Sequence, residues 1–288
     1  MQSIKAIKQR RTVVTNMKQA MKAMNLVATA KLRKSRERWG NALPFLEGTD
    51  NIMLNAAKSP ATASNIYVRQ RDNQHKNTGY IVLTSDRGKC GSYNINICKA
   101  AISHASTYGK NALILPVGTR GTEFFLSNSQ NIHRQLGSLP EAPTYEDAET
   151  IGAQVLADFA GEIDELYIAF TRFHTVLNLE PTIKPILPLS LRFKSEALNS
   201  EEPTEMEYDP DVDSFLGYMA PMYLTTQIYG AMLEAALCEQ AARMVATDTA
   251  TNNAEELIES LTLMFNRQRQ SMITQEITEI VSGASALT

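Results

Sequence analysis

The sequence predicts an α/β protein in which the N- and C-terminal helices form a long antiparallel coiled coil and a small α/β domain is inserted between them. Three observations indicate this class. Apolar residues recur at alternating steps of three and four near each of the two ends of the chain, which keeps them on one stripe of a helix. Short apolar runs alternate with helical segments in the middle. Helices at opposite ends of a chain can pair only if the segment between them folds back on itself.

The first helix is expected over Ser3–Trp39, where Gly40 and Pro44 weaken or kink it. A further helical piece is expected over Phe45–Ala57. The apolar seam follows a seven-residue repeat, with one slot interrupted by Arg10. The residues expected in this seam are Ile7, Val14, Met17, Met21, Met24 and Ala28. We expect the methionines to pack as core, since their flexible side chains adapt to a partner helix.

The middle of the chain changes to short apolar runs separated by helices. The expected strands are Tyr80–Thr84, Ala112–Val117, Leu166–Phe173 and Thr182–Leu189. The expected helices are Ile95–Tyr108, Thr122–Leu126 and Tyr145–Ala160. This alternation favours a small, Rossmann-like α/β domain over residues 78–190.

An acidic segment without apolar periodicity, Glu196–Asp213, follows this domain and is expected to be a solvated linker. The last helix should begin near Ser214 and could reach Ala286, because no proline follows Pro221. Its terminal seam is expected at Ile273, Ile277, Ile280, Ala284 and Leu287. The predicted organisation is therefore an N-terminal helix (1–58), an α/β domain (78–190), a linker (191–213) and a C-terminal helix (214–288).

Composition limits the class of protein. Hydrophobic residues make up 43% of the 288 residues, as in ordinary soluble proteins. No stretch reaches the roughly eighteen uninterrupted apolar residues of a membrane span, and the polar N-terminal residues do not resemble a signal peptide. The three cysteines show no metal-ligand spacing, and their odd number favours a reducing, cytosolic compartment.

The net charge of −3 hides a strong asymmetry. Residues 1–40 carry eleven Lys or Arg against one Glu, whereas residues 217–288 carry eight acids and three arginines. The two terminal helices should therefore attract each other. The basic excess that remains must face an acidic protein surface, anionic lipid or nucleic acid.

Four segments, in this order along the chain, resemble the gamma subunit of F-type ATP synthases. They are MKAMNLVATAKLRKSRER (Met21–Arg38), LTSDRGKCGSYN (Leu83–Asn94), EQAARMVA (Glu239–Ala246) and ITQEITEIVSGASA (Ile273–Ala286). The resemblance covers essentially the full length. Two positions depart from the family pattern: Lys89 replaces an apolar residue and Ser92 replaces a glycine.

The resemblance implies a rotor without bond chemistry of its own and without a cofactor or metal. Its coiled coil would stand inside a ring of alpha and beta subunits, and its α/β domain would bind epsilon and rest on the membrane c-ring. Ion flow would turn the c-ring and gamma together, and the asymmetric shaft would change the conformations of the beta sites. The complex would lie at the cytoplasmic face of a bacterial plasma membrane.

The resemblance also implies roles for particular residues. Those expected to contact the alpha/beta ring are Met24, Lys31, Arg33, Lys34, Arg36, Arg269, Gln270, Thr274 and Glu276. A second set is expected in the part of the α/β domain that lies near epsilon and the c-ring, called the foot below. It consists of Asp86, Arg87, Gly88, Cys90 and Gly91. For the polar residues the alternative is a solvated helix face, and for Met24 it is simple packing in the seam.

The loop that contains the foot residues is glycine-rich and lies between a strand and a helix, as in a phosphate cradle. It lacks the G-x-x-x-x-G-K-[ST] and G-x-G-x-x-G spacings, however, so we expect its glycines to serve turn geometry. The four histidines are isolated, and no nucleophile elbow occurs.

Two other classes of protein remain as alternatives. A basic coiled-coil protein that binds nucleic acid would use the N-terminal helix, and its affinity would fall steeply with salt. Against this, Trp39 is the sole aromatic residue in residues 1–40, so we expect no nucleic-acid partner. A small-molecule α/β enzyme would need pocket motifs, which the sequence lacks.

Overall fold

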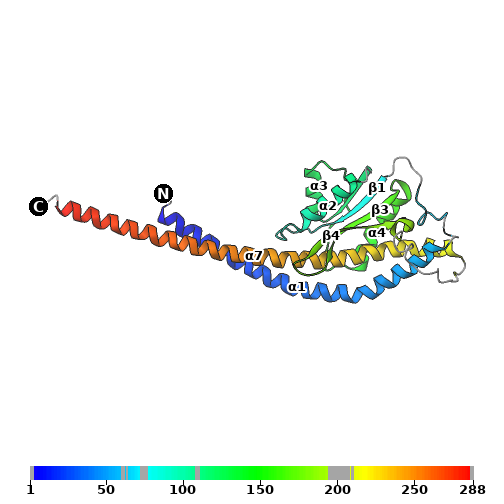
Figure 1. Ribbon diagram of the computed structural model, residues 1–288, viewed down its shortest axis with the longest axis horizontal. Helices are drawn as coiled ribbons and strands as arrows, with labels where there is room; N and C mark the ends of the chain where they lie inside the picture. The colour runs from blue at the N-terminus through cyan, green and yellow to red at the C-terminus, as the bar shows by residue number, and fades with distance from the viewer. Residues whose placement is uncertain are drawn as a thin grey trace. The chain divides into compact units, whose positions relative to one another are not determined.

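The computed structural model describes residues 3–59, 62, 64–71, 77–107, 111–193, 208 and 211–285 (Figure 1). The chain forms two compact units. Unit 1 consists of Met1–Ala28 and Met244–Thr288, and unit 2 of Thr29–Arg243. Two helices pass through both units: α1 (Ile4–Lys58) and α7 (Val212–Ser285). The expected linker (Glu196–Asp213) falls mostly outside the described residues, and the four domain boundaries drawn from the sequence stay predictions.

Helix α1 is one continuous helix, so the division into two helical pieces is wrong. Pro44 lies inside it and is exposed. A proline removes one backbone hydrogen bond and bends a helix, but it does not have to end it when the flanking turns are packed. Met53 and Ala56, in the turns that follow Pro44, are completely buried in the core of unit 2. This packing holds α1 in helical form beyond the proline.

In unit 1 the seven-residue repeat of α1 is confirmed, with Met21 partly buried at its expected place, but two of the six residues expected in the seam are wrong. The buried residues of the repeat are Ile7, Val14 and Ala28. Met17 and Met24, in contrast, leave 48% and 36% of their surface exposed. The partly buried positions that alternate with the buried residues are instead Arg11, Lys18 and Asn25. The sequence pattern alone could not choose between the two sets, because both fit the same repeat.

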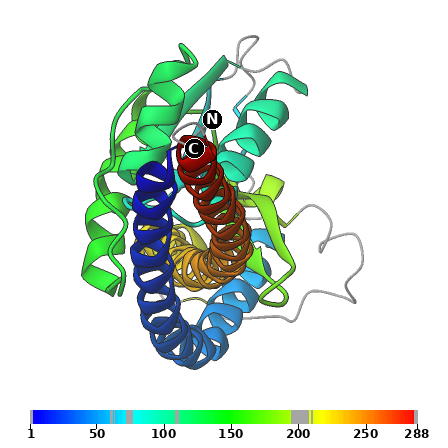
Figure 2. The same ribbon diagram turned by 90° about the vertical axis from the view of Figure 1, so that its left-hand side faces the viewer.

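The polar residues enter the seam because each of them contacts α7. The guanidinium of Arg11 lies 5.5 Å from the ring centroid of Phe265. Lys18 forms an ion pair with Glu255, and the Asn25 amide donates a hydrogen bond to a backbone carbonyl of α7 at 2.9 Å. Polar side chains in a seam fix the register of two helices at some cost in stability. In unit 1, α1 and α7 lie side by side (Figures 1 and 2).

The terminal seam of α7 does not pair with the N-terminal seam as expected. The N-terminal residues Ile7 and Val14 pack against a more internal part of α7, at Ala254, Ile258, Leu261 and Phe265. The described part of α1 begins about one turn before Ile7, and residues 269–282 of α7 are all exposed. Ile273, Ile277 and Ile280 are among them, the last exposed by 71%. Leu287 lies outside the described residues.

Unit 2 contains a four-stranded sheet with the order β2-β1-β3-β4. The strands are β1 (Asn77–Leu83), β2 (Asn111–Val117), β3 (Glu165–Phe173) and β4 (Leu179–Leu187). Strand β1 is parallel to both β2 and β3, and β4 is antiparallel to β3. The helices are α2 (Tyr93–Thr107), α3 (Thr119–Ser127), α4 (Tyr145–Gly161) and α5 (Leu189–Arg192). The α/β domain predicted from alternating runs is confirmed.

The two faces of the sheet are covered by different helices. One face, with Ile81, Leu115 and Ile168, packs against α4 and the first part of α7. The other face, with Tyr80 and Val82, packs against α2 and α3. Residues 223–240 of α7 are buried on nearly all sides in unit 2, which explains why this part of the helix shows no clear amphipathic stripe. Among the described residues no helix is long and apolar enough to cross a membrane.

Helix α7 also packs closely against α1 within unit 2. A Cβ atom placed on Gly230 would lie 2.7 Å from Cδ1 of Leu46, so the absence of a side chain allows the helices to approach. Between β2 and α3, Gly118 has φ of 95° and its Cβ would lie 2.2 Å from the carbonyl oxygen of Thr84. Only glycine fits this turn, which positions the loop after β1.

Candidate functional site

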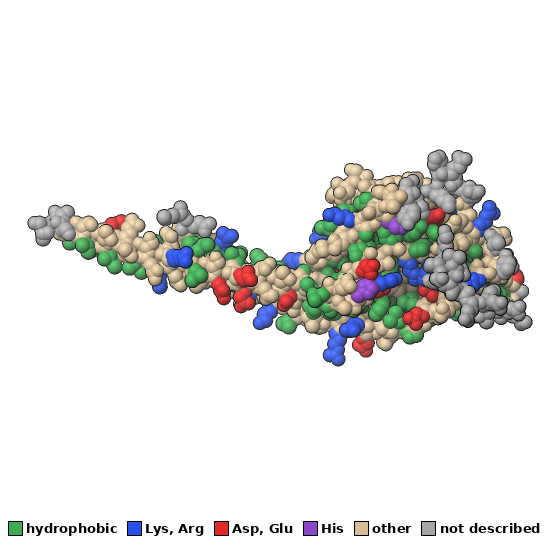
Figure 3. Space-filling model, in the orientation of Figure 1, with side chains coloured by type: hydrophobic (Ala, Val, Ile, Leu, Met, Phe, Trp, Pro, Cys, Tyr) green, Lys and Arg blue, Asp and Glu red, His purple; other side chains and the backbone are tan. Residues whose placement is uncertain are grey.

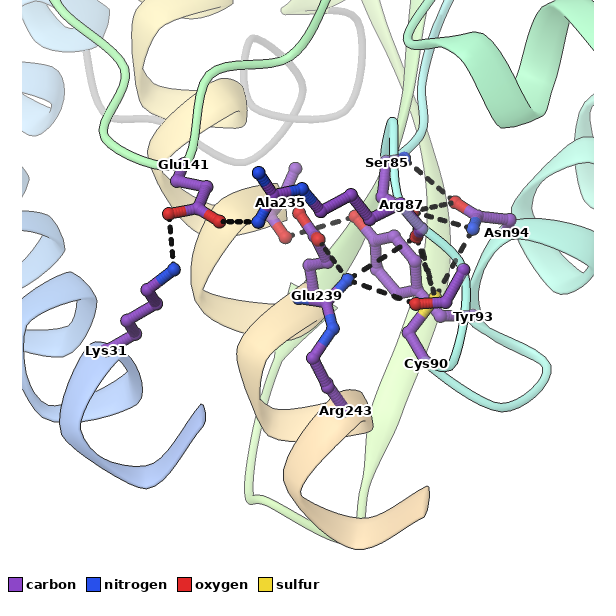
Figure 4. Close-up of polar contacts among 11 residues, drawn as sticks. Lys31, Ser85, Arg87, Cys90, Tyr93, Asn94, Glu141, Ala235, Glu239 and Arg243 are labelled. Atoms are coloured by element: carbon purple, nitrogen blue, oxygen red, sulfur yellow. Dashed lines mark hydrogen bonds and ion pairs between the residues drawn. The ribbon is translucent and has the colours of Figure 1, made fainter. Parts of the chain in front are cut away.

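The loop between β1 and α2 is held in a fixed shape by its own polar groups (Figure 4). The Ser85 backbone N–H donates to Oδ1 of Asn94 at 2.9 Å. The Asn94 amide donates to the Ser85 hydroxyl at 2.8 Å, and that hydroxyl donates to the Arg87 carbonyl at 2.8 Å. These bonds explain the DRGKCG turn as a structural feature and agree with its lack of phosphate-binding spacing.

The glycines of this loop were expected to adopt a positive φ. One of them does and the other does not. Gly91 has φ of 59°, as expected for a position that requires glycine. Gly88 does not have a positive φ, and Lys89 adopts φ of 65° in its place. A Cβ on Gly88 would meet the Arg120 guanidinium at 3.5 Å, which is ordinary contact. The left-handed turn therefore falls on a lysine, which is an uncommon conformation for a residue with a side chain.

Asp86 has a clear structural role. Its carboxylate accepts hydrogen bonds from the Thr119 backbone N–H at 2.8 Å and from the Thr119 hydroxyl at 3.0 Å. It therefore caps the N-terminus of α3 from a different element, where a negative charge is favoured. Cys90 is buried beside Tyr93 and Cys238. Burial raises the pKa of the Cys90 thiol, so the thiolate needed for reactivity is disfavoured.

Helix α7 fastens the loop through a buried ion pair between Glu239 and Arg243, whose atoms lie 2.6 Å apart. The Arg243 guanidinium also donates to the carbonyl oxygens of Arg87 and Gly88, each at 3.4 Å. Burial raises the pKa of Glu239, and the nearby Arg243 partly offsets this effect. One partly buried cation thus links α7 to the backbone of the loop (Figure 4).

A second ionic contact joins three separate elements at the surface. The Glu141 carboxylate, in the loop before α4, forms an ion pair with Lys31 of α1 through Oε2. Its other oxygen, Oε1, lies 3.0 Å from the Arg87 guanidinium. The hydrogen bond from Lys31 is the main cause that lowers the pKa of Glu141. Lys31, expected to contact a partner, is thus already paired within the chain.

The other basic residues expected on α1 occupy different surroundings. Arg33 and Lys34 are exposed. Arg36 is exposed too, but its guanidinium lies 6.0 Å from the ring centroid of Phe173, within the range of a weak cation–π contact. The structure therefore leaves Arg33 and Lys34 displayed at the surface of unit 2, while Arg36 also covers part of the sheet domain.

In unit 1 the exposed Met24 belongs to a second apolar stripe of α1. This stripe has the spacing of a helical face and consists of Val13, Met17, Ala20, Met24 and Val27. All five residues are exposed. Soluble proteins rarely leave a contiguous apolar face on a long helix without a binding partner.

The four polar residues expected near the C-terminus are all exposed on α7: Arg269, Gln270, Thr274 and Glu276. The Thr274 hydroxyl donates to the Gln270 carbonyl at 2.9 Å, within the helix. Apolar side chains of the same segment gather along one side of it (Figure 3). They are Met272, Ile273, Ile277, Ile280 and Val281.

The described residues contain no group of three or more His, Cys, Asp or Glu that could hold a metal ion. Sequence reasoning missed Glu141, Glu239 and Arg243 as members of the polar network. For Glu239 and Arg243 a signal existed, because their spacing of four residues places an acid and a base on the same helix face. Glu141 gave no signal, since it is 110 residues from Lys31 in the sequence.

Two long helices carry exposed apolar and basic side chains, and a sheet domain is fastened to them by buried ionic contacts. These features indicate a protein that works through its contacts with other chains. The comparisons with known proteins say which one of this class it resembles. A family model described as ATP synthase matches residues 3–287.

The ATP synthase gamma chain of Lachnoclostridium phytofermentans is 38% identical over 294 residues, which cover 100% of both chains. The sodium-ion-specific ATP synthase gamma chain of Acetobacterium woodii is 36% identical over 302 residues, which cover 99% of each. The fold is also similar to a chain in the Euglena gracilis mitochondrial ATP synthase (OSCP/F1/c-ring), with a TM-score of 0.70 and 18% identity over 99% of this chain and 94% of that one. The protein belongs to the ATP synthase gamma chain family and has its non-catalytic, central-stalk role.

Proposed function

We propose that unit 1 works as the rotor shaft inside a ring of alpha and beta subunits, while unit 2 binds epsilon and contacts the membrane c-ring. The solved structures support partners of this general kind, since one is of a mitochondrial ATP synthase with F1 and a c-ring and another is of a central stalk with a c-ring. The bacterial origin of the relatives in sequence supports a place at the cytoplasmic face of a bacterial plasma membrane.

The observation that carries this proposal is the exposed apolar surface of unit 1. Two apolar helix faces of unit 1 are exposed to water. One contains Met17 and Met24 of α1, and the other contains Ile277 and Ile280 of α7. Burial of a fully exposed side chain of this size contributes about 1.5–3 kcal/mol, and these four, which are 36–71% exposed, would contribute a corresponding part of it. A ring that surrounds unit 1 would cover both of these helix faces.

Polar contacts between the rotor and the ring subunits would then make the ring respond to the angle of the rotor. We propose that the exposed Arg33, Lys34 and Arg36, together with Lys31, meet acidic surface of the ring subunits. Near the tip of α7 we propose that Arg269, Gln270, Thr274 and Glu276 form hydrogen bonds to ring loops. Each angle of the rotor would present a different set of contacts, so the ring sites would change conformation by differential binding free energy.

The position of the loop Asp86–Gly91 supports a different place from the foot that the sequence suggested. The loop lies beside Lys31 and Arg243, close to the points where both helices continue into unit 1. Lys58, where α1 ends, is about 40 Å further along the helix at 1.5 Å per residue. We therefore propose that Arg87, Cys90 and their neighbours belong to the ring-facing end of unit 2, and that the end at Lys58 and Val212 forms the foot.

Capture of the tagged full chain from its native membranes, followed by mass spectrometry, tests the proposal. We expect alpha, beta and epsilon subunits to be recovered together with ATPase activity. Recovery of nucleic acid with the chain, or of the chain without ATP synthase subunits, would contradict the proposal.

A matched pair of variants then tests the tip contacts. Arg269→Ala with Gln270→Ala should lower coupled ATP hydrolysis by about fivefold or more, because the two lost polar contacts together contribute about 1–3 kcal/mol, while assembly persists. Arg120→Ala, which removes an exposed arginine of α3 paired with Glu123, should leave the activity unchanged. Equal activity of the two variants would count against a contact role for the tip residues.

A further inference from the structure

Glu141 is a surface acid whose one carboxylate serves two cations from two distant elements. Oε2 pairs with Lys31 of α1 and Oε1 pairs with Arg87 of the loop after β1 (Figure 4). Glu141 itself lies in a third element, before the capping residue Thr144 of α4. The two cations thus form a site that fits one carboxylate, and a side chain of the same chain fills it.

Glu141 is held weakly enough for another carboxylate to replace it. The side chains of Arg87 and Glu141 are 77% and 43% exposed, and that of Lys31 is 37% exposed. Exposed ion pairs of this kind contribute little to stability. Water and solutes can reach all three groups, so a competing carboxylate could replace Glu141 without unfolding any part of the chain.

The cations, in contrast, are attached to parts of unit 2 that are firmly held. The carbonyl of Arg87 accepts hydrogen bonds from Arg243 and from the Ser85 hydroxyl, which fix the backbone under the exposed guanidinium. Lys31 belongs to the middle of α1. Arg87 and Lys31 therefore present their charges from fixed positions, while Glu141 comes from a segment that follows β2 and α3 without regular structure.

The surface around this site is basic. Lys34 and Arg38 follow Lys31 at steps of three and seven residues, which places all three on one face of α1. Both are exposed. A lone carboxylate can satisfy only part of this positive surface, whereas an acidic segment with several carboxylates could satisfy more of it.

We propose that Glu141 is an internal substitute for a carboxylate of an acidic partner segment, which displaces Glu141 and pairs with Lys31 and Arg87 when it binds. This inference rests on the proposed function, since the acidic segment would belong to a ring subunit. The exchange replaces one carboxylate by another at the same two cations. Its net free energy is therefore small, as a contact that forms and breaks in every rotation requires.

The test uses the full chain and a fluorescent octaglutamate peptide, whose binding is followed by anisotropy at low salt. Glu141→Gln removes the internal competitor and should tighten binding about three- to tenfold, which corresponds to the free energy of one or two exposed ion pairs. Glu123→Gln changes the net charge equally, but it frees Arg120 on α3 instead. It should leave the affinity close to that of the natural chain.

A double-mutant cycle separates competition from a general charge effect. In a chain that carries Lys31→Gln and Arg87→Gln, the peptide should bind more weakly, and addition of Glu141→Gln should no longer tighten binding. An unchanged or weaker affinity of the single Glu141→Gln variant would overturn the inference. So would an equal gain for Glu123→Gln.

Assembly with alpha and beta subunits tells the two proposals apart. If the natural chain assembles but Glu141→Gln does not tighten peptide binding, the inference about Glu141 is wrong and the proposed function stands. If Glu141→Gln tightens peptide binding but the natural chain does not assemble with alpha and beta subunits, the carboxylate exchange is supported and the proposed function is wrong.

Discussion

At the scale of single residues, the ion pair of Glu239 and Arg243 is the contact on which the loop after β1 depends. Glu239 is 4% exposed and Arg243 is its partner within the same helix turn. A buried charge is tolerated only while it is paired and hydrogen-bonded. The same pair also places the carbonyls of Arg87 and Gly88, so its loss should affect both stability and the loop.

We predict that Arg243→Ala lowers the free energy of unfolding by about 3–5 kcal/mol, because it leaves Glu239 buried without its partner. The variant Arg243→Ala with Glu239→Gln should recover part of this loss, since no buried charge then remains. Urea unfolding of the full chain, followed by circular dichroism, measures both values. A double variant no more stable than the single one would show that the unpaired charge is not the cause.

The second residue-scale prediction concerns pH. Burial raises the pKa of Glu234 from its ordinary value of 4.5, although its carboxylate accepts a hydrogen bond from the Phe173 backbone N–H. Because the folded state holds this proton more tightly than the unfolded state does, Glu234 favours folding below pH 4.5. This contribution is lost as the pH rises through the raised pKa of the folded state.

The natural chain should therefore lose stability relative to Glu234→Gln as the pH rises from 4.5 toward neutrality. Free energies of unfolding for both chains at several pH values in this range give the difference directly. The comparison cancels the opposite contribution of Glu141, whose lowered pKa stabilises the fold at higher pH in both chains. A difference that stays constant with pH would contradict the raised pKa.

At the scale of elements, the glycines of α7 show where packing overrides helix propensity. Gly217 has no atom within 4 Å of the position of a Cβ, whereas Gly230 lies against Leu46 of α1. We predict that Gly217→Ala stabilises the chain by about 0.5–1 kcal/mol, the propensity difference. Gly230→Val should destabilise it by about 1–3 kcal/mol because α1 must move away. Thermal unfolding of the two variants provides the measurement.

The sequence predicted most elements to within a few residues. In unit 2 the spacing of apolar residues follows the period of the strand or helix in which they lie. The prediction failed where tertiary contacts decide. Arg11, Lys18 and Asn25 look like surface residues, yet they take the seam because each contacts α7. Pro44 looked like a helix end, but the packing of later turns keeps α1 helical.

The candidate site was predictable only in part, and for the same reason. The resemblance pointed to the basic and loop residues, and the structure brings Lys31 and Arg87 together as neighbours. The acid that joins them, Glu141, lies in an irregular segment far away in the sequence, and no local pattern marks such a residue. Long-range pairs of exposed charges follow from the fold and cannot be seen before it.

At the scale of the whole molecule, the division into two units predicts that the end of α7 can be removed without loss of folding. Residues after Ser271 include Ile273, Ile277 and Ile280, which are exposed. A chain that ends at Ser271 should therefore unfold within about 0.5 kcal/mol of the natural one, as for surface changes. Its complex with alpha and beta subunits should dissociate faster. Loss of cooperative unfolding in the truncated chain would contradict the proposed role.

The pairing of the two chain ends in unit 1 also has a consequence for biosynthesis. Ile7 and Val14 leave the ribosome long before Leu261, against which they pack. Contacts between residues so far apart in sequence form slowly. The apolar stripe of the newly made N-terminal segment therefore stays exposed to solvent while the sheet domain folds. During this time a chaperone could bind the exposed segment.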